Sequence, residues 1–263
     1  MCRELIHIYG PISIHSYGAM MFLGLAAVIV LMLRDPLCRR IMTSEQLLNA
    51  VAWGVVSGII GARILYLAFN WDSTMSIIDA VAIWDGGLSL MGAIIGILIG
   101  LPLYLWYSKI PKLIFFDLFA LYAPLLQAIT RVGCFLAGCC YGAPTTAFWG
   151  ICYHDLNCGA PYDQVIHPTQ LYSSLIQLVI FMVLIIFRKR FYIKPGQLIS
   201  LYLVLAGLER FVVDFWRGDR EFFPQDLLGF ISVHQLLALL VAGIAVIAFF
   251  ICSQRKKSIN EYI

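Results

Sequence analysis

Charged residues are scarce in this sequence. Only 13% of its 263 residues are Asp, Glu, Lys or Arg, whereas 61% are hydrophobic. The mean hydropathy is +0.87. A soluble domain of this length needs a charged surface, so the composition excludes a soluble protein and indicates that lipid surrounds most of the chain. We therefore expect an integral membrane protein.

Other features are also missing. There is no long block of Lys and Arg and the net charge is only +3, so nothing favours binding to nucleic acid. The first apolar segment has neither a basic leader nor a small-residue cleavage site, so we expect no cleaved signal peptide. There is no internal repeat and no pair of broken helices in matching halves, which argues against a transporter of small solutes. The eight cysteines are spread over apolar segments and loops, unlike the framework of a secreted disulfide-rich domain.

Seven apolar segments are long enough to cross a bilayer as helices. We predict an all-α, polytopic membrane protein with about seven transmembrane helices, built as a single transmembrane domain over residues 1–263. The connection 143–168 is too polar to cross the bilayer and predicts a small extracytoplasmic cap between the fourth and fifth spans. The predicted spans are residues 16–33, 47–69, 87–107, 113–129, 167–187, 197–215 and 233–252.

Two patterns along these spans predict packing and orientation. Gly92, Gly96 and Gly100 share one face of the third span, and Gly54 and Gly58 have the same four-residue spacing in the second, so we expect close helix contacts there. Most Lys and Arg residues outside the spans follow the first, third, fifth and seventh spans. The positive-inside rule then places the N-terminus outside and the C-terminus in the cytoplasm.

The segment from Arg131 to Gly142 has an unusual composition. It reads RVGCFLAGCCYG and follows the fourth predicted span. An Arg at the lipid headgroup level presents five donors in a fork that matches a phosphate, and glycines allow backbone or lipid to come close. The alternative interpretation is an interfacial Arg anchor followed by ordinary loop glycines.

Several polar residues from distant parts of the chain fall at or near the predicted outer ends of the spans. We expect them to line a cavity that opens to lipid and binds a phospholipid headgroup. Arg210 and Asp214 share a helix face, so a simple internal salt bridge is the alternative for that pair. Arg63, inside the second span, should face a partner or a polar cavity. The converging residues are Tyr17, Asp85, Arg131, His167, Arg210 and Arg217.

Five motifs in one order, GPISIHSYG, WDGGLSLMG, RVGCFLAGCCYG, HPTQLY and ERFVVDFWR, carry a resemblance. With them, the chain resembles the prolipoprotein diacylglyceryl transferase family over nearly its whole length. The resemblance implies a transferase of lipoprotein biosynthesis in the bacterial cytoplasmic (inner) membrane. Such an enzyme moves the diacylglyceryl group of phosphatidylglycerol to the lipobox cysteine sulfur of a prolipoprotein signal peptide and releases glycerol-1-phosphate. We expect no cofactor and no metal ion.

The resemblance also suggests roles for individual residues. Arg131 and Arg210 would neutralise the phosphate as its bond to carbon breaks, and Tyr17 is the third expected catalytic residue. A base must also generate the thiolate, which is the nucleophilic form of a thiol. Besides Arg131, the expected substrate-binding residues are His15, Arg63, Asp85, Gly142, His167, Gln170, Tyr172, Asp214 and Arg217.

The sequence departs from the family pattern at the expected base. Met91 stands where the family usually has His, and a thioether cannot take a proton at neutral pH. Three explanations remain open. His15, His167 or Tyr17 acts as the base, the acceptor thiol arrives partly ionised beside the two arginines, or the reaction has changed.

The central motif departs as well, because Cys134, Ala137 and Cys139 replace the expected Asn, Asn and Glu. The default interpretation is that small buried residues fill the vacated space. The spacing lacks the paired CxxC of zinc ribbons, so a disulfide among these thiols and Cys152 or Cys158 is favoured over a metal site that includes His154. A reactive Cys139 that carries the transferred group is a further alternative.

Two alternative functions compete with the family reaction. One is a phospholipid-dependent transferase of the same architecture with an acceptor other than a lipobox cysteine. The other is a lipid-binding or transport protein that catalyses nothing. Turnover separates them, since the family reaction consumes phosphatidylglycerol only with a lipobox peptide, the first alternative only with another acceptor, and the second not at all.

Overall fold

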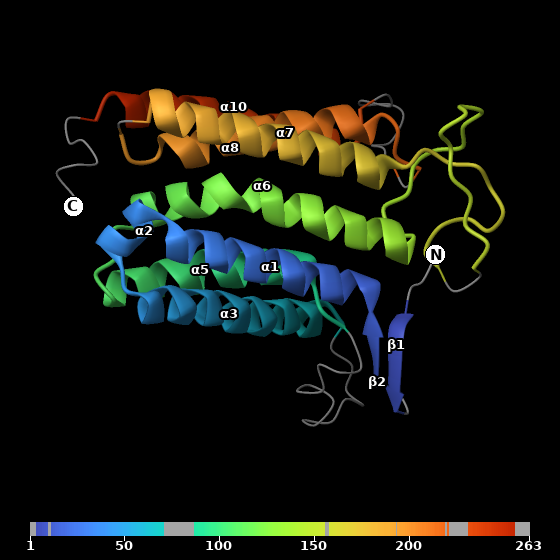
Figure 1. Cartoon of the computed structure of the whole chain (residues 1–263), viewed down its shortest axis with the longest axis horizontal. Coiled ribbons are helices and arrows are strands. Elements are labelled where there is room, and N and C mark those ends of the chain that lie inside the picture. Colours follow the sequence, from blue (N-terminus) through green and yellow to red (C-terminus); the bar gives the residue numbers. More distant parts are fainter. Residues whose placement is uncertain are drawn as a thin grey trace. The chain divides into compact units, whose positions relative to one another are not determined.

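The computed structural model describes residues 4–9, 12–70, 87–155, 158–192, 194–218, 220 and 231–255 (Figure 1). The chain divides into two compact units, a larger one of Met1–Met32 with Phe116–Tyr262 and a smaller one that covers Leu33–Phe115. In chain order the elements are β1 (Glu4–Tyr9), β2 (Ile12–His15), α1 (Ser16–Arg34), α2 (Pro36–Ile41), α3 (Ser44–Asn70), α5 (Leu90–Tyr107), α6 (Lys112–Ala137), α7 (Thr169–Arg190), α8 (Gln197–Asp214) and α10 (Val233–Ser253).

Six of the described helices, α1, α3, α5, α6, α7 and α10, are long and apolar enough to cross a membrane. This confirms the prediction of a helical, multi-pass membrane protein. The sixth predicted span is also a helix, α8, but it contains Glu209, Arg210 and Asp214 near its end. The count of seven spans therefore stays a prediction. The sequence did not predict the antiparallel β1–β2 hairpin, in which Glu4 lies opposite His15.

In the larger unit, α8 packs against both α7 and α10 (Figure 1). The start of α8 is held by a carboxylate from another helix. Asp117, which is fully buried near the beginning of α6, accepts hydrogen bonds from Gly196 N at 2.6 Å, Ile199 N at 2.8 Å and the Tyr192 hydroxyl at 2.7 Å. A carboxylate at a helix N-terminus satisfies free backbone donors and complements the helix dipole. This capping role explains why an acidic residue is tolerated in the fourth predicted span.

Replacing Asp117 with Ala should therefore destabilise the protein strongly. The change removes the acceptor from three donors, and each buried group left unpaired costs about 1–3 kcal/mol. We expect a clearly lower Tm in detergent for Asp117→Ala, and a smaller loss for Asp117→Asn, which keeps one oxygen acceptor. The exposed Glu45 provides a matched control, because Glu45→Gln should leave the Tm close to that of the parent. Equal Tm values for Asp117→Ala and Glu45→Gln would contradict the capping role.

In the smaller unit, α3 and α5 approach each other through glycines, as predicted for the third span. A Cβ added to Gly61 would lie 2.8 Å from the Gly96 Cα, and one added to Gly92 would lie 2.9 Å from the Ala62 Cα. Such short distances leave no room for a larger side chain. Gly58 also contacts α5, through Ile97, but Gly54 has nothing within 4 Å of its added Cβ, so the predicted packing role of Gly54 is wrong.

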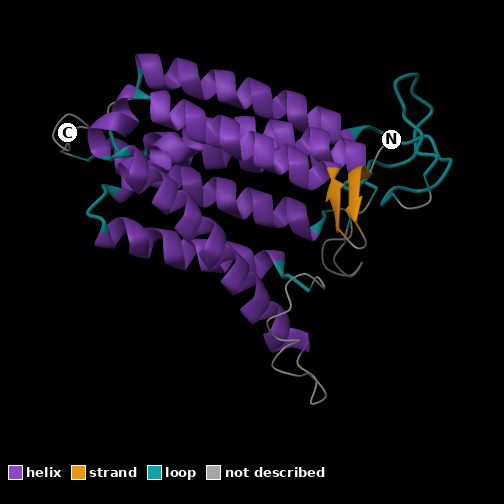
Figure 2. Ribbon diagram, turned by 60° about the horizontal axis from the view of Figure 1, so that its bottom comes forward, coloured by secondary structure: helices purple, strands orange, loops and turns teal. Residues whose placement is uncertain are grey.

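The polar connection between α6 and α7 projects beyond the ends of these helices as the large loop in Figure 2. It has a small core of its own, formed by Tyr153, Ala160 and Ile166. Ile151 and Ile166 exchange backbone hydrogen bonds of 3.0 and 2.9 Å, and the Tyr153 hydroxyl donates to the Phe135 carbonyl at 2.7 Å. These contacts tie the loop to the last turns of α6. Its predicted role as a cap over residues 143–168 stays a prediction, as does the single-domain organisation.

Candidate active site

The helix that carries Arg131 continues further than the sequence predicted. The fourth span was expected to end at residue 129, but α6 runs to Ala137 because Val132, Phe135 and Leu136 continue its apolar pattern. Arg131 is therefore a partly buried residue within the last turns of α6 rather than a residue just beyond the helix. Gly133 lets α1 come close, since an added Cβ would lie 3.2 Å from the Tyr17 Cα. This contact places Tyr17 beside the Arg131 segment.

A tight turn ends α6 and gathers three thiols. Gly138 has a φ of +73°, a value that glycine adopts without strain. The Gly138 N–H donates to the Phe135 carbonyl at 3.4 Å and the Cys139 N–H to the Cys134 carbonyl at 3.2 Å, which is the hydrogen-bond pattern of a Schellman motif. Cys140, with a φ of +57°, turns the chain back again. As a result the sulfur atoms of Cys134, Cys139 and Cys140 lie within 4.8 Å of one another.

The thiols are free. Every cysteine that the structure describes is unpaired, so the expected disulfide is not formed. Hydrogen bonds from Cys134 and Cys139, followed by the charges of Arg217 and Arg131, lower the pKa of Cys140 against the opposing effect of its burial. The same interactions place Cys140 within electrostatic range of both arginines. The turn therefore joins soft sulfur donors to a strongly positive region.

The loop that follows meets two other segments at Gly142. The Gly142 N–H donates to the His167 carbonyl at 3.1 Å, and the next N–H along the chain, that of Ala143, donates to the Trp216 carbonyl at 2.7 Å. The Gly218 N–H returns a 3.1 Å bond to the Tyr141 carbonyl. A Cβ on Gly142 would collide with the His167 carbonyl oxygen and lie 2.9 Å from the Trp216 oxygen. This junction connects the end of α6, the start of α7 and the end of α8.

The HPTQLY motif fixes the cysteine turn from α7. The Thr169 hydroxyl donates to the Cys140 carbonyl at 3.0 Å, and the Gln170 side-chain nitrogen donates to the Cys139 carbonyl at 2.8 Å. Gln170 is buried, so it is placed to hold this turn from inside the protein. These two bonds explain why polar residues begin an otherwise apolar helix.

His167 and Tyr172 form a polar pair on the same motif. The His167 Nδ1 lies 3.1 Å from the Tyr172 hydroxyl, which also accepts a 2.7 Å hydrogen bond from the Trp149 indole. Both members of the pair are partly exposed, so a ligand can reach them.

Three arginines, from α6, α8 and the segment after α8, lie near one another in the larger unit. The Arg210 guanidinium on α8 interacts electrostatically with Arg131 on α6 and with Arg217 beyond α8. The Tyr17 phenol is likewise within electrostatic range of Arg131. Arg131 and Arg210 are partly buried, and within the part of the chain that the structure describes neither guanidinium makes a hydrogen bond or an ion pair. The carboxylates of Asp214 and Glu209 also interact with Arg210, but the neighbouring guanidiniums of Arg131 and Arg217 make this cluster a candidate site for an anionic ligand.

Asp214 forms its ion pair with Arg220 rather than with Arg210. Its carboxylate is buried, accepts a 2.5 Å hydrogen bond from Ser232 and forms a 3.3 Å ion pair with Arg220. Ser232 and Gln235 form the capping box that begins α10. The alternative of an Arg210–Asp214 salt bridge is therefore wrong, because Asp214 instead ties the end of α8 to the start of α10. This role was not predicted, because Arg220 and Ser232 follow Asp214 by six and 18 residues and lie beyond the end of its helix.

The remaining predicted residues are placed differently. His15 is exposed at the end of β2, directly before α1, and Tyr17 is 41% exposed. Arg63 belongs to the smaller unit, where it donates to the Gly87 carbonyl at 2.9 Å and lies over the Tyr66 ring. Asp85 lies outside the described residues. The structure thus brings together Tyr17, Arg131, Gly142, His167, Gln170, Tyr172, Arg210 and Arg217 within one unit.

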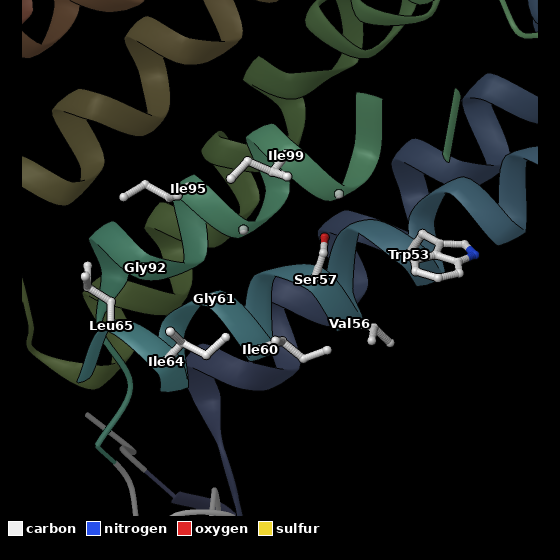
Figure 3. Close-up of a pocket in the computed structure, with 12 residues that line it drawn as sticks. Trp53, Val56, Ser57, Ile60, Gly61, Ile64, Leu65, Gly92, Ile95 and Ile99 are labelled. Atoms are coloured by element: carbon white, nitrogen blue, oxygen red, sulfur yellow. The ribbon is translucent and has the colours of Figure 1, made fainter. Parts of the chain in front are cut away.

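The smaller unit carries an apolar groove along α3 and α5 (Figure 3), with a volume of about 370 Å³. Its walls are formed by Trp53, Ile60, Ile64, Ile95 and Ile99 with the packed glycines, and none of its lining residues is charged. The groove can hold an apolar chain, but it offers no group for acid, base or anion chemistry. The groups that can bind an anion therefore lie in the larger unit, in the cluster of Arg131, Arg210 and Arg217, which we call the arginine site.

These features define a multi-pass membrane protein with a cluster of arginines near the ends of α6 and α8. Its sequence identifies the family. A model of the prolipoprotein diacylglyceryl transferase family matches residues 3–251, and the chain belongs to this family.

Curated relatives match the chain over most of its length. The phosphatidylglycerol–prolipoprotein diacylglyceryl transferase of Clostridium tetani is 33% identical over 254 residues, which are 96% of this chain and 98% of the relative. A second such transferase of Clostridium perfringens is 33% identical over 238 residues, or 89% of this chain and 90% of the relative. The enzyme of Thermotoga maritima is 36% identical over 204 residues, covering 74% of this chain and 66% of the relative.

Proposed function

We propose that this protein is a phosphatidylglycerol–prolipoprotein diacylglyceryl transferase. The observation that carries the proposal is the cluster of Arg131, Arg210 and Arg217, of which the first two make no hydrogen bond or ion pair among the described residues. The phosphate of phosphatidylglycerol is a ligand of the required charge, and it lies at the depth where the ends of membrane helices meet the lipid headgroups. The names of the curated relatives support the same reaction.

The proposed reaction is a displacement at carbon. The thiolate of the acceptor cysteine attacks the glyceryl carbon that is bonded to the phosphate oxygen, a carbon–sulfur bond forms, and the carbon–oxygen bond breaks. Glycerol-1-phosphate leaves with an additional negative charge, which Arg131 and Arg210 stabilise. Tyr17, His167 and Tyr172 border the site and offer hydroxyl and imidazole groups to the lipid headgroup.

The acceptor in this proposal is the lipobox cysteine of a prolipoprotein signal peptide, and the protein lies in the bacterial inner membrane. In the larger unit the basic end of α7, Arg188 to Arg190, lies at the opposite end of that helix from the HPTQLY motif. The positive-inside rule then assigns the arginine site to the outer leaflet, with the N-terminus outside and the C-terminus in the cytoplasm. That leaflet is where an exported precursor presents its cysteine.

A transfer assay tests the proposal directly. Purified protein in detergent is incubated with phosphatidylglycerol and a lipobox peptide, and the peptide mass and released glycerol-1-phosphate are measured. We expect the mass of one diacylglyceryl group to be added to the peptide and an equal amount of glycerol-1-phosphate to appear. A peptide with Ser in place of the lipobox Cys should give neither product. Lipid binding without any transfer would instead favour a non-catalytic lipid-binding protein, and transfer to another acceptor would favour a different transferase.

A further inference from the structure

The three thiols of the α6 turn form a compact donor set. The sulfurs of Cys134, Cys139 and Cys140 lie within 4.8 Å of one another, and each residue offers one ligand atom. Zinc–thiolate bonds of about 2.3 Å in a tetrahedral site put the sulfurs about 3.8 Å apart, so a small adjustment of side-chain rotamers suffices for all three to reach one ion. Sulfur donors of this kind select soft or borderline metals such as zinc.

The backbone around the thiols is held in place before any ion binds. The Schellman motif fixes Cys139 above the last turn of α6, and Thr169 and Gln170 hold the carbonyl groups of Cys140 and Cys139. In metal sites, hydrogen bonds from the groups around the ligands orient the ligands in this way. The three residues belong to one short segment, but α7 fixes its conformation.

The surroundings fit a thiolate-bound metal in charge and access. Three thiolates with Zn²⁺ carry a net negative charge, which Arg217 and Arg131 compensate from within electrostatic range of Cys140. Cys134 is buried, whereas Cys139 and Cys140 are partly exposed, so the trio is open on one side. A site with three protein ligands and an open position is the arrangement of catalytic zinc.

A second group of possible metal ligands differs from the three thiols in composition, exposure and location. Cys152, His154 and Asp163 also lie within 4.8 Å of one another, but His154 and Asp163 are exposed, and the His154 Nδ1 already lies 3.0 Å from the Asp163 Oδ1. This group supplies only one thiol, and it lies in the loop between α6 and α7. It serves below as a control.

We propose that Cys134, Cys139 and Cys140 bind a zinc ion whose fourth position takes the acceptor thiol of the transfer reaction. The part of this inference that concerns the acceptor rests on the proposed function. A thiol that coordinates zinc loses its proton to solvent and becomes the nucleophilic thiolate. The zinc-bound sulfur attacks the glyceryl carbon beside Arg131, the carbon–oxygen bond to phosphate breaks, and glycerol-1-phosphate departs. The neutral thioether product is a weaker ligand than the thiolate, so it leaves the ion, whose oxidation state never changes.

Cobalt provides a direct probe of the proposed site. Metal-free protein, prepared in detergent with a chelator and a reductant, is titrated with Co²⁺. We expect one equivalent to give the sulfur-to-cobalt charge-transfer absorption and the visible bands of a tetrahedral site with three thiolates, and Zn²⁺ to displace it. Cys134→Ser, Cys139→Ser and Cys140→Ser should each lower the charge-transfer intensity, whereas Cys152→Ser should leave the spectrum unchanged. A spectrum without thiolate bands, or one abolished by Cys152→Ser alone, would overturn the site.

The fourth position is tested separately with the peptide. A lipobox peptide added to the cobalt protein without lipid should increase the charge-transfer absorption, because a fourth thiolate joins the ion, and the peptide with Ser for Cys should not. An unchanged spectrum with the Cys peptide would overturn the assignment of the fourth ligand even if cobalt binds.

The transfer assay then separates the two proposals. We expect removal of zinc to reduce transfer by about 10²- to 10⁴-fold, the range typical of the loss of a proton-transfer group, and added Zn²⁺ to restore it. Full transfer by metal-free protein would overturn the zinc inference and leave the proposed function standing. Metal and peptide binding without any transfer from phosphatidylglycerol would contradict the proposed function while supporting the metal site.

Discussion

Arg131→Ala is expected to reduce diacylglyceryl transfer by at least about 10²- to 10³-fold, the loss seen when one preorganised donor to a developing charge is removed. Arg131 lies within the folded end of α6, where it is the guanidinium that α6 contributes to the arginine cluster. In the Arg131→Ala variant, Arg210 and Arg217 must stabilise the leaving group without the hydrogen-bond donors of the Arg131 guanidinium. The rate of glycerol-1-phosphate release measures the effect.

Two further variants define the cause of that loss. Arg131→Lys keeps the charge but not the planar five-donor fork, so it should recover only part of the activity. Arg190→Ala removes an exposed Arg from the opposite end of α7 and should leave the rate unchanged. Activity of Arg131→Ala within a few-fold of the parent protein would remove Arg131 from the proposed mechanism.

Gly142→Ala is expected to have an effect of comparable size through geometry alone. The added methyl group would collide with the His167 carbonyl and crowd the Trp216 carbonyl, so the three chain segments of the junction must separate. Because this junction sets the position of Arg217 and His167 against the end of α6, the arginines move apart. A misplacement of about 1 Å at a catalytic site can cost about 10²-fold in rate.

The test of this prediction compares two glycines. The transfer rate of Gly142→Ala is measured beside that of Gly243→Ala, whose added methyl group in α10 meets nothing within 4 Å. Helix content by circular dichroism should be retained in both variants, with a strong loss of transfer in Gly142→Ala only. Normal transfer by Gly142→Ala would show that the junction does not position the site.

The positions of the helices could be predicted from sequence because hydrophobicity and length decide what crosses a bilayer. The end of α6 could not, since a charged residue looks like a boundary whereas Val132 to Ala137 continue the helix. The role of Asp214 depended on Arg220 and Ser232, whose proximity no local pattern reveals. The thiol trio was likewise hidden, because its spacing matches no zinc motif and only the turn at Gly138 brings Cys134 back to Cys139 and Cys140.

Arg131 and the HPTQLY residues were predictable because charge and polarity stand out in apolar surroundings. The individual contacts that these residues make were not predictable. Gln170 was expected to contact substrate, but its side chain is buried and holds the Cys139 carbonyl, while the neighbouring Thr169, which the sequence did not single out, holds Cys140. The signal that could have found Thr169 is its place in the same motif, one residue before Gln170.

The cap that Asp117 places on α8 has a consequence for how the chain enters the membrane. Glu209, Arg210 and Asp214 make α8 costly to insert, since ionisable residues oppose partitioning of a lone helix into lipid. The carboxylate that receives the first turn of α8 is synthesised 79 residues before Gly196, on a helix that is long and apolar enough to insert alone. The α6 helix therefore provides a binding site for the start of α8 before α8 is synthesised. We expect α8 to insert into the membrane by packing against α6 rather than as an independent segment.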